Sequence, residues 1–243
     1  MVHRLLKTAQ RVGIPLGRWP EEGSKILHLR RLMTFLSIDL VLDVGAHHGE
    51  FGQELRRDVR YDGDMISFEP AATSAEALRQ VAGKDDRWTV EQVALGDRTG
   101  SAELHTYPLS QLNSLRTPTA FGRETWRMHG STVEAVTTAR LDELSIELQS
   151  RTGILLKVDT QGHDLAVLAG AEKTLAHVQA LQIEVPVIPL YEGTPLLEET
   201  LGVVKGMGFA LSGLFPVAHD PELRVVEFDL VAVRSSPRAH GGS

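Results

Sequence analysis

The fold is decided by residues 42–50, which read Leu42-Asp43-Val44-Gly45-Ala46-His47-His48-Gly49-Glu50 and follow the mainly apolar run 38–41. The stretch predicts a buried strand, a turn with two spaced glycines, and a helix that begins near Phe51. Gly45 and Gly49 can adopt positive φ angles and let the backbone approach a ligand closely. Because the first amides of a helix lack partners within it, they would point at that ligand. The stretch therefore indicates an α/β domain with a binding site at the end of its first strand.

A second expected strand, within residues 64–70, ends in an acidic residue. Glu69 lies 26 residues after Asp43, and a carboxylate at this strand end suits a ribose with both hydroxyls free. The glycine spacing is Asp-x-Gly-x-x-x-Gly rather than the Gly-x-Gly-x-x-Gly of dinucleotide sites. Together these features indicate a nucleoside cofactor. Because the chain lacks the glycine fingerprint that binds the phosphates of a dinucleotide, S-adenosylmethionine (SAM) is favoured over NAD.

The composition narrows the class of protein. A chain of 243 residues fits one α/β domain. With 25 basic and 32 acidic residues, the net charge of −7 argues against nucleic acid as the main partner, because phosphate binding needs a basic field. The lack of cysteine excludes disulfides and thiolate metal sites. No apolar run approaches the roughly 20 residues of a membrane span, and the N-terminus lacks a secretory signal pattern, so we expect a cytoplasmic protein.

Three segments are expected along the chain. Residues 1–37 form an N-terminal helical extension with helices at 3–12 and 24–36, residues 38–234 form the main domain, and the tail 235–243 is disordered. In the main domain strands and helices alternate, which predicts a doubly wound sheet. The expected strands are 40–44, 64–68, 89–94, 101–107, 132–139, 153–158, 180–185, 209–215 and 225–233, and the expected helices are 50–57, 72–82, 164–175 and 195–207.

The last two expected strands follow each other without a helix between them. They predict an antiparallel hairpin at one edge of a mostly parallel sheet, which is the layout of SAM-dependent methyltransferases. Ligands of open α/β sheets bind outside the carboxyl ends of the strands. The residues expected to face the site are therefore those that follow the strands, namely Gly45, Glu69, Gly96, Asp97, Asp159, Glu184 and Asp229.

Three motifs resemble those of the FkbM family of SAM-dependent methyltransferases, over about residues 39–234. The first is 41–49 with Phe68-Glu69-Pro70 downstream, the most specific is 156–171 (LKVDTQGHDLAVLAGA), and the third is Ile183-Glu184-Val185 followed by 189–193. The family often has Glu at the position of Gln161, and the amide excludes Gln161 as a base. The resemblance implies a Rossmann-like class I methyltransferase fold and O-methylation of sugars, glycolipids or natural products.

Several residues are candidates for contact with SAM. Gly45 and Gly49 are expected to shape the turn, and Glu69 to bind the ribose. Asp43 either orients loop amides, reaches the methionine end of SAM, or is a structural cap. Asp97 either accepts a hydrogen bond from the adenine amino group or only closes a turn. The resemblance places Asn113 and Ser114 near SAM or the acceptor, and the set of cofactor candidates is Asp43, Gly45, His47, Gly49, Glu69, Asp97, Asn113 and Ser114.

Asp159, His163 and Glu184 are the candidates for the chemistry. An alcohol is a poor nucleophile at neutral pH, so a base or a metal must assist its deprotonation. His163 could be the base, since imidazole titrates near neutral pH, or it could merely cap a helix. Asp159, Glu184 and Asp229 offer three oxygen ligands that would suit Mg²⁺. The alternative is that these carboxylates bind sugar hydroxyls directly or cap the sheet.

The segment 108–131 is too long for a simple connection, and we expect it to be a lid over the acceptor. The aromatic residues Tyr107, Phe121, Trp126 and Tyr191 could stack on a sugar face. The expected reaction is methyl transfer from SAM to a hydroxyl of a carbohydrate or glycosylated metabolite, such as an oligosaccharide, polysaccharide precursor or glycolipid. An NAD-dependent sugar dehydrogenase and a non-catalytic SAM-binding protein are the alternatives. Apolar surface on the N-terminal helices is compatible with a homodimer.

Overall fold

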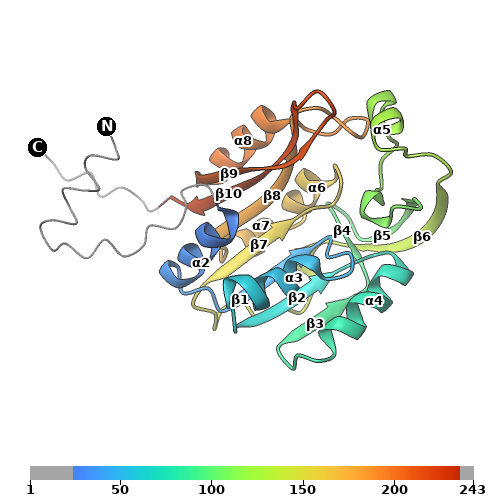
Figure 1. The fold of residues 1–243 in the computed structure, drawn as a ribbon. Coiled ribbons are helices and arrows are strands. Elements are labelled where there is room, and N and C mark those ends of the chain that lie inside the picture. Colours follow the sequence, from blue (N-terminus) through green and yellow to red (C-terminus); the bar gives the residue numbers. More distant parts are fainter. Residues whose placement is uncertain (1–23, 236–243) are drawn as a thin grey trace, which may run out of the picture.

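A seven-stranded sheet forms the centre of the molecule (Figure 1). The structure is a computed structural model that describes residues 24–235. The expected helix 3–12 and nearly all of the expected disordered tail lie outside the described residues. The strand order is β3-β2-β1-β7-β8-β10-β9, and the strands are β1 (Leu40–Val44), β2 (Asp64–Phe68), β3 (Trp88–Glu91), β7 (Ile154–Val158), β8 (Ala180–Pro186), β9 (Phe209–His219) and β10 (Val225–Arg234).

The pairing confirms a mostly parallel sheet with an antiparallel hairpin at one edge. Strands β3, β2, β1, β7 and β8 run parallel, and β10 runs antiparallel between β8 and β9. Asp43 of β1 lies opposite Ser67 of β2 and Lys157 of β7, and Lys157 lies opposite Gln182 of β8. Because residues in register point to the same face of a sheet, these four polar side chains form one row across four strands.

Helices pack on both faces of the sheet (Figure 1). Residues of α2, α3, η1 and α4 form one core with strand residues such as Val41 and Leu155, and residues of α6, α7 and α8 form another with Leu42 and Leu156. Successive strand residues alternate between faces, so the row from Ser67 to Gln182 lies on the face of α2 to α4. The bounds are α2 (Lys25–Phe35), α3 (Glu50–Glu54), the π-helical turn η1 (Leu55–Val59), α4 (Ala72–Ala82), α6 (Asp164–Ala169), α7 (Glu172–Leu175) and α8 (Leu197–Gly206).

The expected strand 89–94 is wrong as a single strand. Its first part is β3 of the main sheet, while β4 (Ala94–Leu95) pairs with β6 (Thr132–Ala139) in a separate sheet of order β4-β6-β5. The chain changes direction between them, where the amide of Val93 donates to the carbonyl of Glu91. The remaining elements are β5 (Gly100–Thr106), the 3₁₀ turns η2 (Ser110–Leu112) and η3 (Leu141–Glu143), and α5 (Ala120–Thr125).

The expected helix 164–175 is also divided, into α6 and α7. A Cβ on Gly170 would lie 1.9 Å from the carbonyl oxygen of Gly96, so the two loops approach as closely as backbone allows and the helix is interrupted there. Of the helices in residues 24–235, none is both long and apolar enough to span a bilayer.

The central strands give the first testable prediction. Leu156 in β7 is fully buried, whereas Leu223 in the turn between β9 and β10 is 82% exposed. Leu156→Ala should lower the free energy of unfolding by about 2–5 kcal/mol, because a cavity remains in the core. Leu223→Ala should change it by less than about 0.5 kcal/mol. Urea denaturation of both variants checks this, and equal losses would contradict the assignment of β7 to the centre of the sheet.

Candidate functional site

A cavity of about 450 Å³ lies at the carboxyl ends of the parallel strands, which is a volume typical of small-molecule sites. It lies where the sequence places the ligand. The expected site residues that line it are Gly45, His47, Glu69, Asn113, Ser114, Asp159, His163, Glu184 and Asp229. Among the described residues, Asp43, Gly49 and Asp97 are outside its lining.

The loop after β1 is shaped by its two glycines. Gly45 has a φ of 75°, and a Cβ there would lie 1.8 Å from the carbonyl oxygen of Asp159. Gly49 has a φ of 85° at the N-cap of α3, and a Cβ there would meet the side chain of Leu78 at 2.8 Å. Both positions therefore need glycine for the backbone itself, while only Gly45 also borders the cavity.

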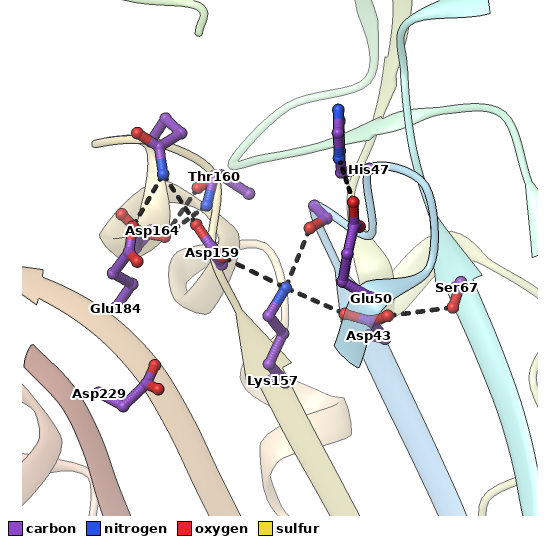
Figure 2. A network of polar contacts seen from close by, with 12 residues as sticks. Asp43, His47, Glu50, Ser67, Lys157, Asp159, Thr160, Asp164, Glu184 and Asp229 are labelled. Carbon is purple, nitrogen blue, oxygen red and sulfur yellow. Dashed lines mark hydrogen bonds and ion pairs between the residues drawn. The ribbon is translucent and has the colours of Figure 1, made fainter. Parts of the chain in front are cut away.

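Lys157 is the central residue of the site, and sequence reasoning gave it no role. Its ammonium group donates to the carbonyl oxygen of Gly45 at 2.9 Å and lies 3.1 Å from Oδ1 of Asp43 and 3.5 Å from Oδ2 of Asp159 (Figure 2). Burial acts to lower the pKa of Lys157, but the charges of Asp43 and Asp159 outweigh it, so the pKa is raised. The lysine is therefore a permanent cation beneath the glycine loop.

Asp43 lies under the loop and not against the cavity. It is 1% exposed, it pairs with Lys157, and its Oδ2 accepts a hydrogen bond from Ser67 at 3.2 Å. Ser67 also accepts a hydrogen bond from the indole of Trp88 at 2.9 Å. Of the open alternatives for Asp43, the geometry favours the structural one, because its carboxylate acts on the loop through Lys157.

Glu69 does border the cavity. Its carboxylate accepts hydrogen bonds from the backbone amides of His47 and Ala71, each at 2.9 Å. Burial raises the pKa of Glu69 to about 7. The side chain therefore ties β2 to the loop after β1, and it titrates close to neutral pH.

His47 is held from three sides. Besides its amide bond to Glu69, its Nδ1 lies 2.9 Å from Oε1 of Glu50 and its Nε2 lies 2.8 Å from Oγ of Ser110. The imidazole stacks on that of His48, with ring centroids 3.6 Å apart. His47, His48 and Glu50 bring ligand-type atoms within 4.8 Å of one another. Both ring nitrogens of His47 are already engaged, however, so this cluster links the loop after β1 to the segment 108–131.

Asp97, Asn113 and Ser114 have mainly structural contacts. Asp97 is half-exposed and lies 3.5 Å from Arg98, which fits the alternative of a turn residue. Asn113 accepts a hydrogen bond from the amide of Tyr107 at 2.9 Å, and Ser114 donates to the carbonyl of Gln161 at 2.7 Å. Asn113 and Ser114 thus hold the segment 108–131 against the cavity that they line.

Asp159 and Glu184 lie side by side at the ends of β7 and β8. The amide nitrogen of Gln161 donates to both, at 3.1 Å to Asp159 and 2.8 Å to Glu184. Burial and then the charge of Asp159 raise the pKa of Glu184 well above its usual range. Glu184 therefore favours its protonated form, whereas Asp159 has the ammonium of Lys157 beside it.

Asp229, the third residue of the expected Mg²⁺ site, pairs with a lysine. Its Oδ2 lies 3.1 Å from the ammonium of Lys25 in α2, and in Figure 2 no contact connects it to Asp159 or Glu184. Within the described residues, the three-ligand cluster is at His47, His48 and Glu50 instead. The Mg²⁺ site at Asp159, Glu184 and Asp229 therefore stays a prediction, and in this structure Asp229 pairs with Lys25 of α2.

His163 is the N-cap of α6 and lines the cavity. Its Nε2 lies 2.9 Å from the position that a Cβ on Gly96 would take, so the ring packs on the loop after β4. Burial lowers the pKa of His163, which keeps the imidazole neutral. The ring therefore borders the cavity next to the loop at Gly96 and Asp97, where the sequence suggested an adenine contact.

The segment 108–131 is tied to the rest of the domain at several points. Arg116 donates to the carbonyls of Glu192 and Gly193, and the hydroxyl of Tyr191 donates to the carbonyl of Leu112 at 2.8 Å. Tyr107 and Tyr191 are buried in the cluster under this segment. Of the expected stacking residues, Trp126 is the one that lines the cavity.

Sequence reasoning gave no role to several polar residues that line the cavity, although a signal was available for three of them. Lys157 interrupts the apolar strand 154–158, Gln182 interrupts the strand 180–186, and Glu227 lies in β10 two residues before Asp229. A polar residue inside an otherwise buried strand requires a partner or a ligand. Other lining residues, such as Glu54 of α3, carried no such signal.

The ion pair at the centre of the site can be tested by stability. Lys157→Met keeps the length of the side chain and removes its charge. We expect the free energy of unfolding to fall by about 3–5 kcal/mol, because Asp43 is left as an uncompensated buried charge. The exposed Lys205→Met in α8 is the control, with a change under about 0.5 kcal/mol. Adding Asp43→Asn to Lys157→Met should recover part of the loss, and a loss unaffected by that second change would contradict the pairing.

Comparison with known proteins identifies the family. The model of the methyltransferase FkbM domain matches residues 43–211. The 2-O-methyltransferase NoeI of Sinorhizobium fredii (strain NBRC 101917 / NGR234) is 27% identical over 186 residues, which cover 73% of this chain and 74% of that protein.

Solved methyltransferase structures give weaker likenesses. One is magnesium protoporphyrin IX methyltransferase (ChlM) from Synechocystis PCC 6803 with bound SAM, with a TM-score of 0.46 and 10% identity, over 86% of this chain and 81% of that one. Another is a putative O-methyltransferase from Klebsiella pneumoniae, with a TM-score of 0.47 and 15% identity, over 97% and 90% of the two chains.

The family match spans most of the sheet. It begins near the end of β1 and includes the strands that carry Lys157 and Glu184. The strand order, with one reversed strand next to the last position, is the class I methyltransferase arrangement expected from the sequence. The chain belongs to the FkbM family of SAM-dependent methyltransferases.

Proposed function

We propose that this protein transfers the methyl group of SAM to a hydroxyl of a carbohydrate or glycosylated metabolite. The observation that carries the proposal is the position of Asp159. Its carboxylate lines the same cavity as Gly45 and Glu69. It lies beside Glu184, whose raised pKa favours the protonated form. Transfer to an alcohol needs a group that accepts the hydroxyl proton, and a carboxylate at the end of β7 meets that need.

The residues around the loop after β1 fit SAM. Glu69 offers a carboxylate at the end of β2 for the ribose hydroxyls. Beyond it the cavity has an apolar wall suited to an adenine ring, made by Phe68, Val93, Leu95 and Leu104. Both carboxylate oxygens of Glu69 already accept backbone amides, which fixes its orientation, and each oxygen can accept a further hydrogen bond.

Bound SAM would supply an electrophilic methyl group on its sulfonium. The protein's own contribution is to position the acceptor hydroxyl and to take its proton. The ammonium of Lys157 lies 3.5 Å from Asp159, whereas burial and the charge of Asp159 raise the pKa of Glu184 well above its usual range. Gln161 holds the two carboxyl groups in place. We therefore assign Asp159 as the group that accepts the proton of the substrate hydroxyl. Glu184 is its hydrogen-bonding neighbour, and His163 only lines the cavity.

Two observations support a hydroxyl of a sugar as the acceptor. The relative NoeI is named a 2-O-methyltransferase. Trp126 presents an aromatic surface to the cavity, and an aromatic ring next to polar side chains suits a sugar, which has apolar faces and polar edges. The segment 108–131, which carries Trp126, would then cover the acceptor.

The proposed proton acceptor is tested by Asp159→Asn. We expect methyl transfer to fall by about 10²–10⁴-fold, the usual contribution of a general base, while the affinity for S-adenosylhomocysteine (SAH) changes little. Labelled-methyl transfer to a sugar panel and calorimetry with SAH measure the two effects. The exposed Asp86→Asn is the matched control. Undiminished turnover in Asp159→Asn would refute the assignment.

Metal assistance is tested in the same assay. Asp159 and Glu184 are the two carboxyl groups of the expected Mg²⁺ site that lie together. If Asp159 acts as a base alone, turnover should be the same with added Mg²⁺ and with a chelator. Loss of turnover on chelation would show that a divalent ion activates the hydroxyl instead.

The pKa of Glu69 gives a pH prediction. The ionised carboxylate is the stronger acceptor for ribose hydroxyls, and its pKa is raised to about 7. SAH affinity should therefore increase as pH rises through 7. Glu69→Gln should bind more weakly and lose this pH dependence, whereas Glu91→Gln, at the exposed end of β3, should keep it. Calorimetry on either side of pH 7 makes the comparison, and a wild-type affinity that does not change with pH would contradict the role of Glu69.

A further inference from the structure

The side of the cavity away from the glycine loop is formed by hydrogen-bond acceptors. We use the name acceptor wall, in the sense of hydrogen-bond acceptors, for five residues that line the cavity. They are Gln182 and Glu184 of β8, Glu227 and Asp229 of β10, and Glu54 of α3. Asp229 and Glu184 are directly opposite each other in the antiparallel pairing. The acceptor wall therefore combines four carboxyl groups with one amide.

The strand residues of the acceptor wall lie apart from the glycine loop after β1. Strand β8 is two positions from β1 in the sheet, and β10 is three positions from it. With neighbouring strands about 4.8 Å apart, these distances are about 10 and 14 Å. Glu69 lies on the opposite side of β1, at the end of β2. A cofactor bound by Gly45 and Glu69 thus leaves the acceptor wall for the second substrate.

Gln182 gives the acceptor wall a buried carbonyl oxygen without a donor among the described residues. The side chain is 2% exposed, and its carbonyl oxygen accepts no hydrogen bond from any residue that the structure describes. A buried carbonyl without a donor destabilises the fold by about 1–3 kcal/mol. Gln182 lines the cavity, so a ligand there with an N–H or O–H group would satisfy it.

The acceptor wall already holds one ammonium group from the protein itself. Nζ of Lys25 lies 3.1 Å from Asp229 and 3.2 Å from Glu54. Within the described residues, the cations that line the cavity are Lys25 and Lys157, and both are paired with carboxylates. No arginine in residues 24–235 lines it. An anionic acceptor would find no free partner here, whereas a second ammonium would.

We propose that the acceptor is a hydroxylated compound that carries a free primary ammonium group, of the amino-sugar or aminocyclitol class, and that the acceptor wall binds this ammonium. The inference rests on the proposed methyl transfer and names its substrate class. An ammonium has three donors and no acceptor, which matches a surface of carboxyl and amide oxygens. Glu184 and Glu227 are the partners left unpaired by lysine, and the carbonyl of Gln182 lies beside them.

The protonation of the acceptor wall is consistent with this. Burial, and then the charge of Asp159, raises the pKa of Glu227 to about 8. The empty acceptor wall therefore avoids accumulating negative charge at neutral pH. A bound ammonium would favour the ionised carboxylate and so gain a charge-assisted hydrogen bond.

Calorimetry with the SAH-loaded protein tests the proposal on matched probes. Glucosamine should bind at least about tenfold more tightly than glucose or N-acetylglucosamine, a difference of about 1.4 kcal/mol. Glucose 6-phosphate should bind most weakly. Glu227→Gln should reduce the preference for glucosamine to less than about threefold. Glu222→Gln, which changes an exposed carboxylate in the turn before β10, should leave the preference unchanged.

Lys25→Met provides a second, opposite test. Removing the ammonium of Lys25 frees Asp229 and Glu54, so the affinity for glucosamine should increase while the affinity for glucose does not. If Lys25 only stabilised the site, both affinities would fall together.

The outcomes separate the two proposals. SAH binding with a preference for glucosamine supports both. SAH binding with equal or stronger binding of glucose, N-acetylglucosamine or the phosphate overturns the ammonium inference and leaves the proposed methyl transfer standing. No detectable binding of glucosamine to the SAH-loaded protein also overturns the inference. Failure of SAH itself to bind overturns the proposed function and the inference with it.

Discussion

The site depends on one buried cation. Lys157 holds the carbonyl of Gly45 and the carboxylates of Asp43 and Asp159 around a single ammonium group. Moving such a group from water into the protein costs several kcal/mol unless charges and hydrogen bonds compensate, and here three oxygens do so. The ammonium thereby links the loop after β1 to the residue that follows β7. The glycine loop and the proposed base are therefore positioned by the same interaction.

This cation also belongs to a polar row that leads across the sheet to the cavity. The row of Ser67, Asp43, Lys157 and Gln182 crosses four strands on the face of α2 to α4. Ser67, Asp43 and Lys157 satisfy one another in this row, and the ring of Phe51 in α3 lies over Lys157. Towards the strand ends the apolar core gives way to Asp159 and the acceptor wall, and α2 contributes a lysine there rather than another leucine. The polar row marks the boundary between the packed core and the ligand site.

Much of the fold follows from local sequence, because glycine spacing and apolar periodicity act over a few residues. The loop at Gly45, the parallel strands and the closing hairpin are of this kind. The partner of Asp229 is not, since the ion pair with Lys25 depends on where α2 packs against the sheet. Nor does a sequence show that the strand 89–94 divides between two sheets, or that Gly170 meets the loop at Gly96. Lys157 could have been recognised as unusual in its strand, but its three partners lie on different loops and strands and only the fold brings them together.

The position of Gln161 decides how two acids can lie together. Two ionised carboxylates in contact repel, and one of them then keeps its proton. The amide of Gln161 donates to both Asp159 and Glu184, which a glutamate at this position could not do when ionised. With a glutamate, a third carboxylate would face the same cavity. The amide leaves Asp159 next to the ammonium of Lys157, and it leaves Glu184 with a raised pKa. A single change from carboxylate to amide thereby separates the roles of two neighbouring acids.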